Sequence, residues 1–259
     1  MKKRASLSVD LSPRSGDRKD DLYAHPRSQV AQFAFDQAVV DVFPDMIKRS
    51  VPGYTTVVAM TGLFAARYAG AGGVCYDLGC SLGATTLAMA SALVGTESRI
   101  VGVDNAPAMI ASFRDTLDSR SPDVPVELQC ADIRATEIIG ASVVVLNYTL
   151  QFIAPEERVA LLARIYDGLL PGGVLILSEK VVFEDPGEQE LMTALHLDFK
   201  RANGYSEMEI SQKRSALEHV LIPDSLPAHQ DRLQTAGFER AAVWFQSLNF
   251  ASLLAMKAV

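Results

Sequence analysis

Short apolar runs alternate with longer amphipathic segments through the middle of this chain. The apolar runs span residues 74–78, 99–103, 125–129, 142–146 and 174–178. Segments with helical periodicity follow over residues 83–94, 106–119 and 156–169. A run that is apolar at nearly every position predicts a strand buried on both faces. Such strands alternating with helices predict a mostly parallel sheet covered by helices on both sides, the α/β class.

The N-terminal part contains a polar tail and two predicted helices. Residues 1–30 are rich in Ser, Asp and Arg and are expected to form a mobile tail. The first helix is predicted over 36–49, with an interruption at Phe43-Pro44. The second is predicted over 54–69.

The regular alternation breaks after the last apolar run. Residues 184–221 have the pattern of two helices joined at Asn203-Gly204. Ser206 and Glu209 have the spacing of a capping box, which marks the start of the second helix. We therefore expect a helical insert in the α/β domain.

The α/β pattern resumes near the C-terminus. A helix is predicted over 227–236, and two strands over 240–246 and 249–256 are separated by a turn, which indicates an antiparallel hairpin at the edge of the sheet. Together these elements predict one α/β domain over 31–259, with the insert at 184–221.

Composition narrows the possible functions. The chain has 259 residues, 49% of them hydrophobic, and a net charge of −7, which argues against a broad nucleic-acid surface. No apolar run is long enough to span a membrane, and no secretory signal follows the basic N-terminus. The three cysteines and four histidines lack the spacing of a metal site or a disulfide framework. A metal-free cytoplasmic protein is the expectation.

The first apolar strand runs into a glycine-bearing loop with the pattern Gly79-x-x-x-Gly83, and the second strand ends on Asp104. A glycine loop before a helix lets a ligand approach the backbone, and an acid at the end of the next strand is placed to bind a ribose diol. The loop lacks the G-x-G-x-x-G spacing of dinucleotide sites. It therefore favours a nucleoside ligand without a pyrophosphate, such as S-adenosylmethionine (SAM).

Each of these residues also has a simpler interpretation. Gly79, Cys80 and Ser81 would hold the amino-acid end of the ligand with backbone groups, or would only form a tight turn. Asp104-Asn105 would bind the ribose, although Asp104 could also cap the next helix. A nucleophilic role for Cys80 is disfavoured, because no histidine lies near it in the sequence.

Further candidate ligand residues follow the later strands, and one more lies before the first strand. Asp132-Ile133 follows the third strand and could bind adenine, with an exposed loop acid as the alternative. Asn147 ends an otherwise apolar strand, where ligands of open parallel sheets bind, but it could also form a turn. Tyr54 could cover the site or simply pack against the core.

Arg214 is the main candidate in the insert. Ile210, Leu217 and Leu221 form an apolar stripe on the second insert helix, and Arg214 lies within that stripe. A guanidinium on a buried face needs an anion, either Glu218 at i+4 or a carboxylate of a ligand. The pair Lys200-Arg201 is interpreted as a solvated helix end that could add local positive potential.

Several segments together resemble one family, the carboxy-S-adenosyl-L-methionine synthases. The resemblance covers roughly residues 33–257 and is specific in the insert, where SAM-dependent enzymes differ most. The matching segments are 51–54, 76–84, 103–105, 145–152, 199–206, 211–215 and 248–250.

The resemblance implies a class I SAM-methyltransferase-like fold, with a doubly wound, mostly parallel seven-stranded sheet and an antiparallel C-terminal strand. It implies conversion of SAM and prephenate to carboxy-SAM, phenylpyruvate and water, a homodimer, and a supply of carboxy-SAM to tRNA wobble-uridine carboxymethylation. Arg214 would hold the added carboxylate. The ligand positions it implies are Tyr54, Gly79, Cys80, Ser81, Asp104, Asn105, Asp132, Ile133, Asn147 and Arg214.

Two other functions stay open on the sequence. One is a methyltransferase that acts on a small acidic metabolite, and the other is a non-catalytic SAM-binding dimer. No side chain stands out as a general base, which suits a reaction in which the second substrate supplies the base.

Overall fold

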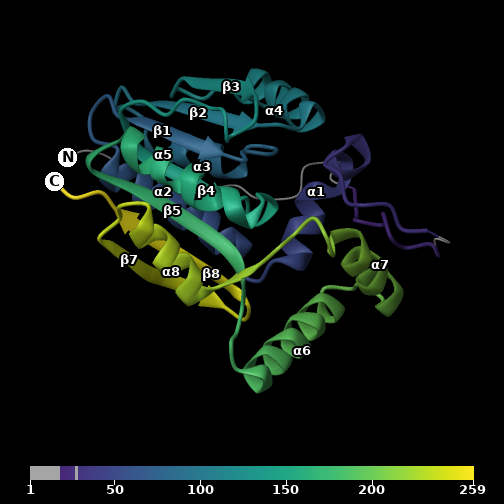
Figure 1. Ribbon diagram of the computed structural model, residues 1–259. Helices are drawn as coiled ribbons and strands as arrows, with labels where there is room; N and C mark the ends of the chain where they lie inside the picture. Colours follow the sequence, from purple (N-terminus) through teal and green to yellow (C-terminus); the bar gives the residue numbers. More distant parts are fainter. Residues whose placement is uncertain (1–17, 27–28) are drawn as a thin grey trace.

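A computed structural model describes residues 18–26 and 29–259 and shows a twisted sheet covered by helices on both faces (Figure 1). The main sheet has the strand order β3-β2-β1-β4-β5-β8-β7. Its strands are β1 Val74–Leu78, β2 Arg99–Asp104, β3 Val126–Cys130, β4 Ala141–Asn147, β5 Leu169–Val182, β7 Arg240–Ser247 and β8 Phe250–Met256. Strands β1 to β5 are parallel to one another, and β8 is antiparallel to both β5 and β7. The predicted sheet and its antiparallel C-terminal hairpin are confirmed.

The helices lie close to where the periodicity predicts them. They are α1 Gln37–Ser50, α2 Tyr54–Tyr68, α3 Ala84–Ala92, α4 Pro107–Arg120, α5 Arg158–Gly168, α6 Pro186–Ala202, α7 Glu207–Leu217 and α8 Leu226–Thr235, with short 3-10 turns at Leu150–Phe152 and Pro155–Glu157. Helices α5 and α8 pack on one face of the sheet, and α2 and α3 pack on the other. This is the two-sided cover that apolar parallel strands require.

Strand β4 is covered on both faces, which explains why its sequence is apolar at successive positions. Val144 and Leu146 belong to the core beneath α5 and α8, while Val143 and Val145 belong to the core beneath α2 and α3. Side chains alternate between the faces of a strand, so a central strand covered on both sides has no solvent-facing position. The run ends at Asn147, where β4 reaches the carboxyl edge of the sheet.

Strand β5 differs from its prediction. The expected strand 174–178 is the middle of a longer one, Leu169–Val182. The register shifts between Ala141 and Val143 of β4, so the glycine-containing segment 170–173 bulges out of the pairing between Leu169 and Val174. A further short strand, β6 at Asp224–Ser225, pairs with the far end of β5 and has no hydrophobic signal of its own.

The insert forms two helices, as predicted, and they stand away from the sheet (Figure 1). The Ser206 side chain accepts a hydrogen bond from the Glu209 backbone N–H, and the Glu209 side chain accepts one from the Ser206 N–H, which confirms the capping box. Leu191 and Leu195 are exposed on α6, 54% and 40% respectively.

Two expectations for the N-terminal region are corrected. Helix α1 continues through Pro44 instead of breaking there. Asp20 and Tyr23 are buried, and Asp20 accepts a hydrogen bond from the Tyr205 hydroxyl, so residues 18–26 pack against the insert rather than forming a mobile tail. The rest of the expected tail, residues 1–17 and 27–28, lies outside the described residues.

Candidate functional site

A cavity of about 510 Å³ opens at the carboxyl ends of the parallel strands. This volume is within the range of small-molecule and cofactor sites, and the location is where open α/β sheets bind ligands. Nine of the ten predicted ligand residues line it: Tyr54, Gly79, Cys80, Ser81, Asp104, Asn105, Asp132, Ile133 and Asn147. The tenth, Arg214, is not among the lining residues.

The glycine loop is fixed by its neighbours. Gly79 has φ +84°, and a Cβ at this position would overlap the Thr149 side chain. The N–H groups of Gly79 and Cys80 both donate to the carbonyl oxygen of Val103, at 2.8 and 3.0 Å. The loop N–H groups are therefore used inside the protein, so a ligand would meet carbonyl oxygens and side chains here rather than free N–H groups.

Asp104 binds backbone groups on both sides of it and also faces the cavity. Its carboxylate accepts hydrogen bonds from the backbone N–H groups of Ser81 and Ala106, both at 2.9 Å. It also lines the cavity, where carboxylate oxygens can accept further hydrogen bonds from a diol. Burial raises its pKa, and the N–H donors oppose that rise. The carboxylate thus ties the glycine loop to the end of β2.

Asn147 presents an unused acceptor. Its amide nitrogen donates to the hydroxyl groups of Thr85 and Thr61, at 3.1 and 3.4 Å. Its Oδ1 atom is buried and has no hydrogen-bond partner among the described residues. Because a buried acceptor without a donor costs about 1–3 kcal/mol, this oxygen favours a ligand that brings an N–H or O–H group.

Asp132 is paired in this structure. Arg134 donates to both of its carboxylate oxygens and also contacts Glu157 at 2.7 Å. The hydrogen bonds from Arg134 lower the pKa of Asp132. Asp132 still lines the cavity, beside the buried side chain of Ile133. An adenine contact would share this carboxylate with Arg134.

Tyr54 both packs and lines the cavity, so neither interpretation excludes the other. It begins α2 directly after Gly53, and its ring lies 6.1 Å from that of Tyr148. Burial raises the pKa of both phenols, so both are neutral hydroxyl groups at pH 7. The Tyr148 hydroxyl is buried with no partner among the described residues.

Burial raises the pKa values of the acidic and thiol groups around the loop. The pKa of Cys80 is raised well above its ordinary value by burial and by the charges of Asp77 and Asp104. A nucleophilic role for Cys80 is thereby opposed, because the thiolate is the reactive form. Burial also raises the pKa of Asp77 to about 7, although Thr86 donates a 2.6 Å hydrogen bond to it.

The stripe argument for Arg214 is wrong in this structure. The buried residues of α7 are Ile210, Lys213 and Ala216, and the Arg214 side chain is exposed. The apolar residues of the predicted stripe do face inward, because Ile210 is buried and Leu217 and Leu221 line the cavity. The inward position beside them is taken by Lys213 and not by Arg214, because α7 packs on α1 and on the docked segment 18–26. Arg214 forms no ion pair with Glu218 or any other described residue, but its charge lowers the pKa values of Lys180 and Lys200. It therefore lies near the cavity without lining it.

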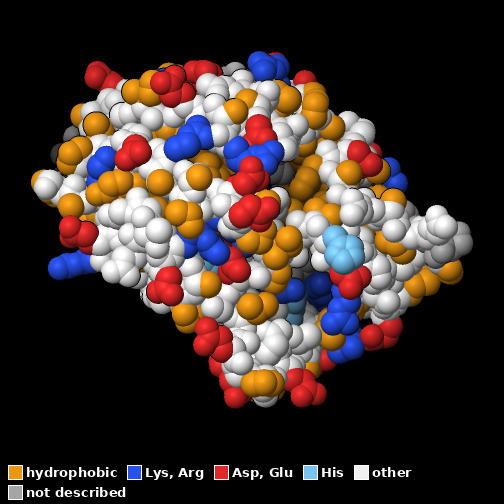
Figure 2. All heavy atoms as spheres, viewed as in Figure 1, with side chains coloured by type: hydrophobic (Ala, Val, Ile, Leu, Met, Phe, Trp, Pro, Cys, Tyr) orange, Lys and Arg blue, Asp and Glu red, His pale blue; other side chains and the backbone are white. Residues whose placement is uncertain are grey.

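The sequence interpretation missed a group of basic residues at the other end of the cavity. Lys180, His196, Lys200 and Lys213 all line it. Figure 2 shows Lys, Arg and His side chains recessed in a hollow between the domain body and the part that carries α6 and α7. Lys200 was interpreted as a solvated helix end, and only the packing of α6 against α1 turns it inward. No sequence motif marks the group, because its members come from separate elements.

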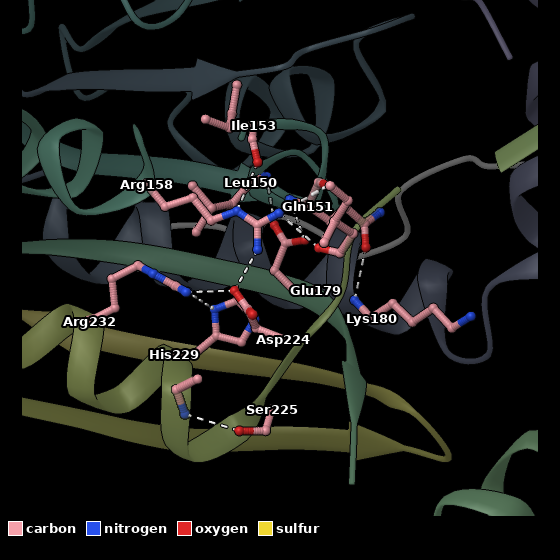
Figure 3. Close-up of polar contacts among 12 residues, drawn as sticks. Leu150, Gln151, Ile153, Arg158, Glu179, Lys180, Asp224, Ser225, His229 and Arg232 are labelled. Carbon is pink, nitrogen blue, oxygen red and sulfur yellow. Dashed lines mark hydrogen bonds and ion pairs between the residues drawn. The ribbon is translucent and has the colours of Figure 1, made fainter. Parts of the chain in front are cut away.

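A buried network supports the loop between the two ends (Figure 3). The Glu179 carboxylate is fully buried and accepts hydrogen bonds from the backbone N–H groups of Thr149, Leu150 and Gln151, at 3.2, 2.8 and 3.0 Å. Arg158, also fully buried, forms a 2.5 Å ion pair with Asp224. Burial raises the pKa of Glu179 to about 8, while these N–H groups and Arg158 oppose the rise.

Two features, a metal-binding cluster and a membrane-spanning helix, are not found in the part of the chain that the structure describes. No cluster of His, Cys, Asp and Glu side chains could hold a metal ion there. Across residues 18–26 and 29–259, no helix has the length and apolar character needed to cross a bilayer.

Comparison with known proteins gives consistent results. A family model described as a methyltransferase domain matches residues 75–173. The chain is 58% identical to the carboxy-S-adenosyl-L-methionine synthase of Geobacter metallireducens, over 93% of this chain and 99% of that protein. It is 57% identical to the protein of the same name from Trichlorobacter lovleyi, over 93% and 99%, and 53% identical to that from Shewanella loihica, over 92% and 98%.

Solved structures agree on the fold. Human N-acetylserotonin methyltransferase in complex with SAM superposes with a TM-score of 0.58 at 16% identity, over 86% of this chain and 56% of that one. PigF with SAH gives a TM-score of 0.60 at 20% identity, over 86% and 60%. This chain thus spans somewhat more than half the length of these structural neighbours, and the shared part has a SAM-methyltransferase fold.

Proposed function

Because this chain belongs to the carboxy-S-adenosyl-L-methionine synthases, a family of SAM-dependent transferases, we propose that it converts SAM and prephenate to carboxy-SAM, phenylpyruvate and water. The observation that carries the proposal is full-length identity above 50% to proteins of that name, which extends through the insert. The cavity supports it, because residues suited to a nucleoside lie together around one space of sufficient volume.

In this proposal the nucleoside end of SAM lies against the glycine loop. Asp104 accepts hydrogen bonds from the ribose diol, and Asn105 lies beside it. Asp132 and Ile133 contact the adenine. The unpartnered Oδ1 of Asn147 accepts a hydrogen bond from the amino-acid end, where Gly79, Cys80 and Ser81 supply backbone contacts.

The proposed reaction balances without an added oxidant or metal. The sulfonium methyl carbon loses a proton and gains the carboxyl carbon that prephenate releases as its ring becomes aromatic. The departing hydroxyl of prephenate takes up the proton and leaves as water. The surrounding buried phenols and thiol stay protonated at neutral pH, so they cannot act as bases in this reaction.

Arg214 is proposed to hold the added carboxylate, and its exposure bears on how it does so. In one chain the guanidinium is exposed and outside the cavity lining. The arrangement compatible with both facts is a homodimer in which Arg214 reaches the cavity of the second copy. The exposed Leu191 and Leu195 on the protruding α6 support a dimer, because paired apolar side chains on such a helix favour a contact.

We also propose that the product is used outside this protein. Carboxy-SAM would serve a separate enzyme that carboxymethylates tRNA wobble uridine in the cytoplasm. The net charge of −7 supports this division of labour, because a tRNA-binding surface requires a basic field.

The direct test is to incubate the purified protein with SAM and prephenate and to measure the mass of the nucleoside product by mass spectrometry. We expect a mass increase equal to one carboxyl group minus one hydrogen. S-adenosylhomocysteine and a methylated acceptor would indicate the methyltransferase alternative. Tight SAM binding with no turnover on any acceptor would indicate the non-catalytic dimer.

A further inference from the structure

The end of the cavity remote from the glycine loop holds more positive than negative charge. Lys180 at the end of β5, Lys200 on α6 and Lys213 on α7 all line it. His196 on α6 lies with them, and its Nε2 atom donates to the Ser50 carbonyl oxygen at 2.9 Å. Burial and the nearby lysines lower the pKa of His196 to about 3.

The acids that surround this group are already engaged. Asp20 accepts hydrogen bonds from the Tyr205 hydroxyl and, at 3.4 Å, from the Lys213 ammonium. Asp45 forms a 3.0 Å ion pair with Arg49 on α1. Neither acid lines the cavity. Asp41 on α1 does line it, but it accepts a 2.9 Å hydrogen bond from Gln37 and lies 3.8 Å from Arg18.

Glu179, next to Lys180 in the sequence, does not neutralise it either. Figure 3 shows the Lys180 side chain extending away from the Glu179 carboxylate, which is held by the backbone N–H groups of the loop 149–151. Successive residues of a strand point to opposite sides, so this separation follows from the strand itself.

Two ammonium groups are thus left without a counter-ion. Lys180 and Lys200 form no ion pair with any residue in the described part of the chain. Burial, with the charges of Lys213, Lys180 and Arg214, lowers the pKa of Lys200 to about 7. Partly buried cations without an anion are unfavourable, so the arrangement favours an anionic ligand.

We propose that Lys180, Lys200 and Lys213 form a subsite for the second substrate. The subsite binds the carboxylate that is not transferred to SAM and that therefore remains on phenylpyruvate. The inference rests on the proposed function and deepens it. A substrate that gives up one carboxylate to SAM must present that group to the sulfonium methyl carbon. Its second carboxylate, the 2-oxo acid end in prephenate, then needs a cation of its own.

The subsite is tested by direct binding of phenylpyruvate, which carries only the retained carboxylate. In calorimetry on the SAM-loaded protein, Lys200→Met and Lys180→Met should each weaken phenylpyruvate binding roughly 10- to 100-fold. SAM affinity should change less than twofold, which also shows that the variants fold. Lys257→Met is the matched control, because the Lys257 ammonium donates to the Tyr166 carbonyl oxygen, and neither residue lines the cavity.

The pH dependence separates a charge contact from a packing role. Because Lys200 loses its proton above about pH 7, phenylpyruvate binding should weaken roughly tenfold or more between pH 7 and pH 9. Lys200→Arg, whose guanidinium keeps its charge, should bind with a flatter pH profile. A packing role would leave the wild-type profile flat in this range.

The outcomes distinguish the two proposals. Lysine-dependent phenylpyruvate binding without carboxy-SAM formation would uphold the subsite and reject the proposed function. Formation of carboxy-SAM by variants that bind phenylpyruvate and prephenate as tightly as the wild type would uphold the function and overturn the subsite.

Discussion

The two ends of the cavity are built in different ways. At one end, Gly79 follows β1, and Asp104 and Asn147 are the last residues of β2 and β4, the strands on either side of β1 in the sheet. At the other end, Lys180, Lys200 and Lys213 come from a strand and two insert helices. The first end is satisfied largely by its own backbone, with Asp104 bound to two N–H groups. The second end leaves two lysines unpaired among the described residues.

This difference indicates how strongly the stability of each end depends on a bound ligand. A preformed loop held by internal hydrogen bonds binds with little reorganisation. A group of partly buried cations destabilises the fold until an anion binds, so anion binding lowers its free energy. We therefore expect substitutions at the first end to impair affinity for SAM, and substitutions at the second end to impair affinity for an acid while relieving strain on the fold.

The largest effect is expected at the nucleoside end. Asp104→Ala removes the proposed ribose contact and the acceptor for two backbone N–H groups. SAM and carboxy-SAM should both bind roughly 100-fold more weakly, a loss of about 2–3 kcal/mol. Calorimetry with each ligand measures this. Asp115→Ala, an exposed acid on α4, is the control, and an unchanged dissociation constant for Asp104→Ala would remove it from the site.

The next prediction concerns Arg214, which lies near the basic end in a single chain without lining the cavity. Arg214→Ala should weaken carboxy-SAM binding by about 2 kcal/mol, roughly 30-fold, and SAM binding less, because SAM lacks the added carboxylate. Arg240→Ala, another exposed arginine, should change neither. Equal losses for both ligands would point to a structural role.

Mixed dimers test whether Arg214 acts across subunits. Combining Arg214→Ala protein with Asp104→Ala protein should restore up to about a quarter of wild-type activity if the arginine serves the second copy, because a mixed dimer then contains one intact site. No recovery after verified subunit exchange would show that Arg214 serves its own chain.

Lys200 should oppose folding while it is charged. Its folded-state pKa of about 7 lies below the ordinary value of 10.5, so the folded protein binds fewer protons than the unfolded chain between these values. The unfolding free energy of the wild type should therefore rise with pH from 7 to 10.5, and the full cost applies below pH 7. Lys200→Met should raise stability at pH 6 by about 1–2 kcal/mol, measured by urea unfolding, with Lys257→Met as the control. A loss of stability at pH 6 would contradict the unpaired charge.

The smallest effect is expected from His196. Its folded pKa of about 3 lies below 6.5, so its neutral form contributes stability that is complete above pH 6.5 and is lost as the pH falls toward 3. Wild-type unfolding free energy should fall by up to about 1 kcal/mol between pH 6.5 and pH 5.5 from this group. His229, with a pKa lowered to about 4, adds to the slope. His196→Gln should flatten the slope, whereas His219→Gln, at an exposed position, should not.

The nucleoside end could be predicted because its signals are local. A strand, a glycine loop and a helix lie consecutively in the chain, and the parallel sheet brings Asp104 and Asn147 to the same edge as Gly79. The continuation of α1 through Pro44 and the docking of residues 18–26 were missed, because both are decided by contacts with distant residues such as Tyr205.

The error at Arg214 has the same origin. Its neighbours at helical spacing suggested a buried stripe, but α7 turns Lys213 inward instead, toward Asp20 and the Ser50 hydroxyl. On a short helix, a rotation of one residue, about 100°, exchanges an exposed position for a buried one. Weak amphipathicity does not fix that rotation, so contacts from α1 and the N-terminal segment do.

The sequence by itself determined the α/β sheet, the order of its elements and the residues at the carboxyl ends of its strands, because side-chain periodicity and turn chemistry act over a few neighbouring residues. Only the tertiary structure decided which cations face the cavity. Lys180, Lys200 and Lys213 meet there because α6 and α7 pack against α1 beside the end of β5, through His196 and Lys213 at Ser50. The burial that lowers the pKa of Lys200 exists only once those elements are packed together.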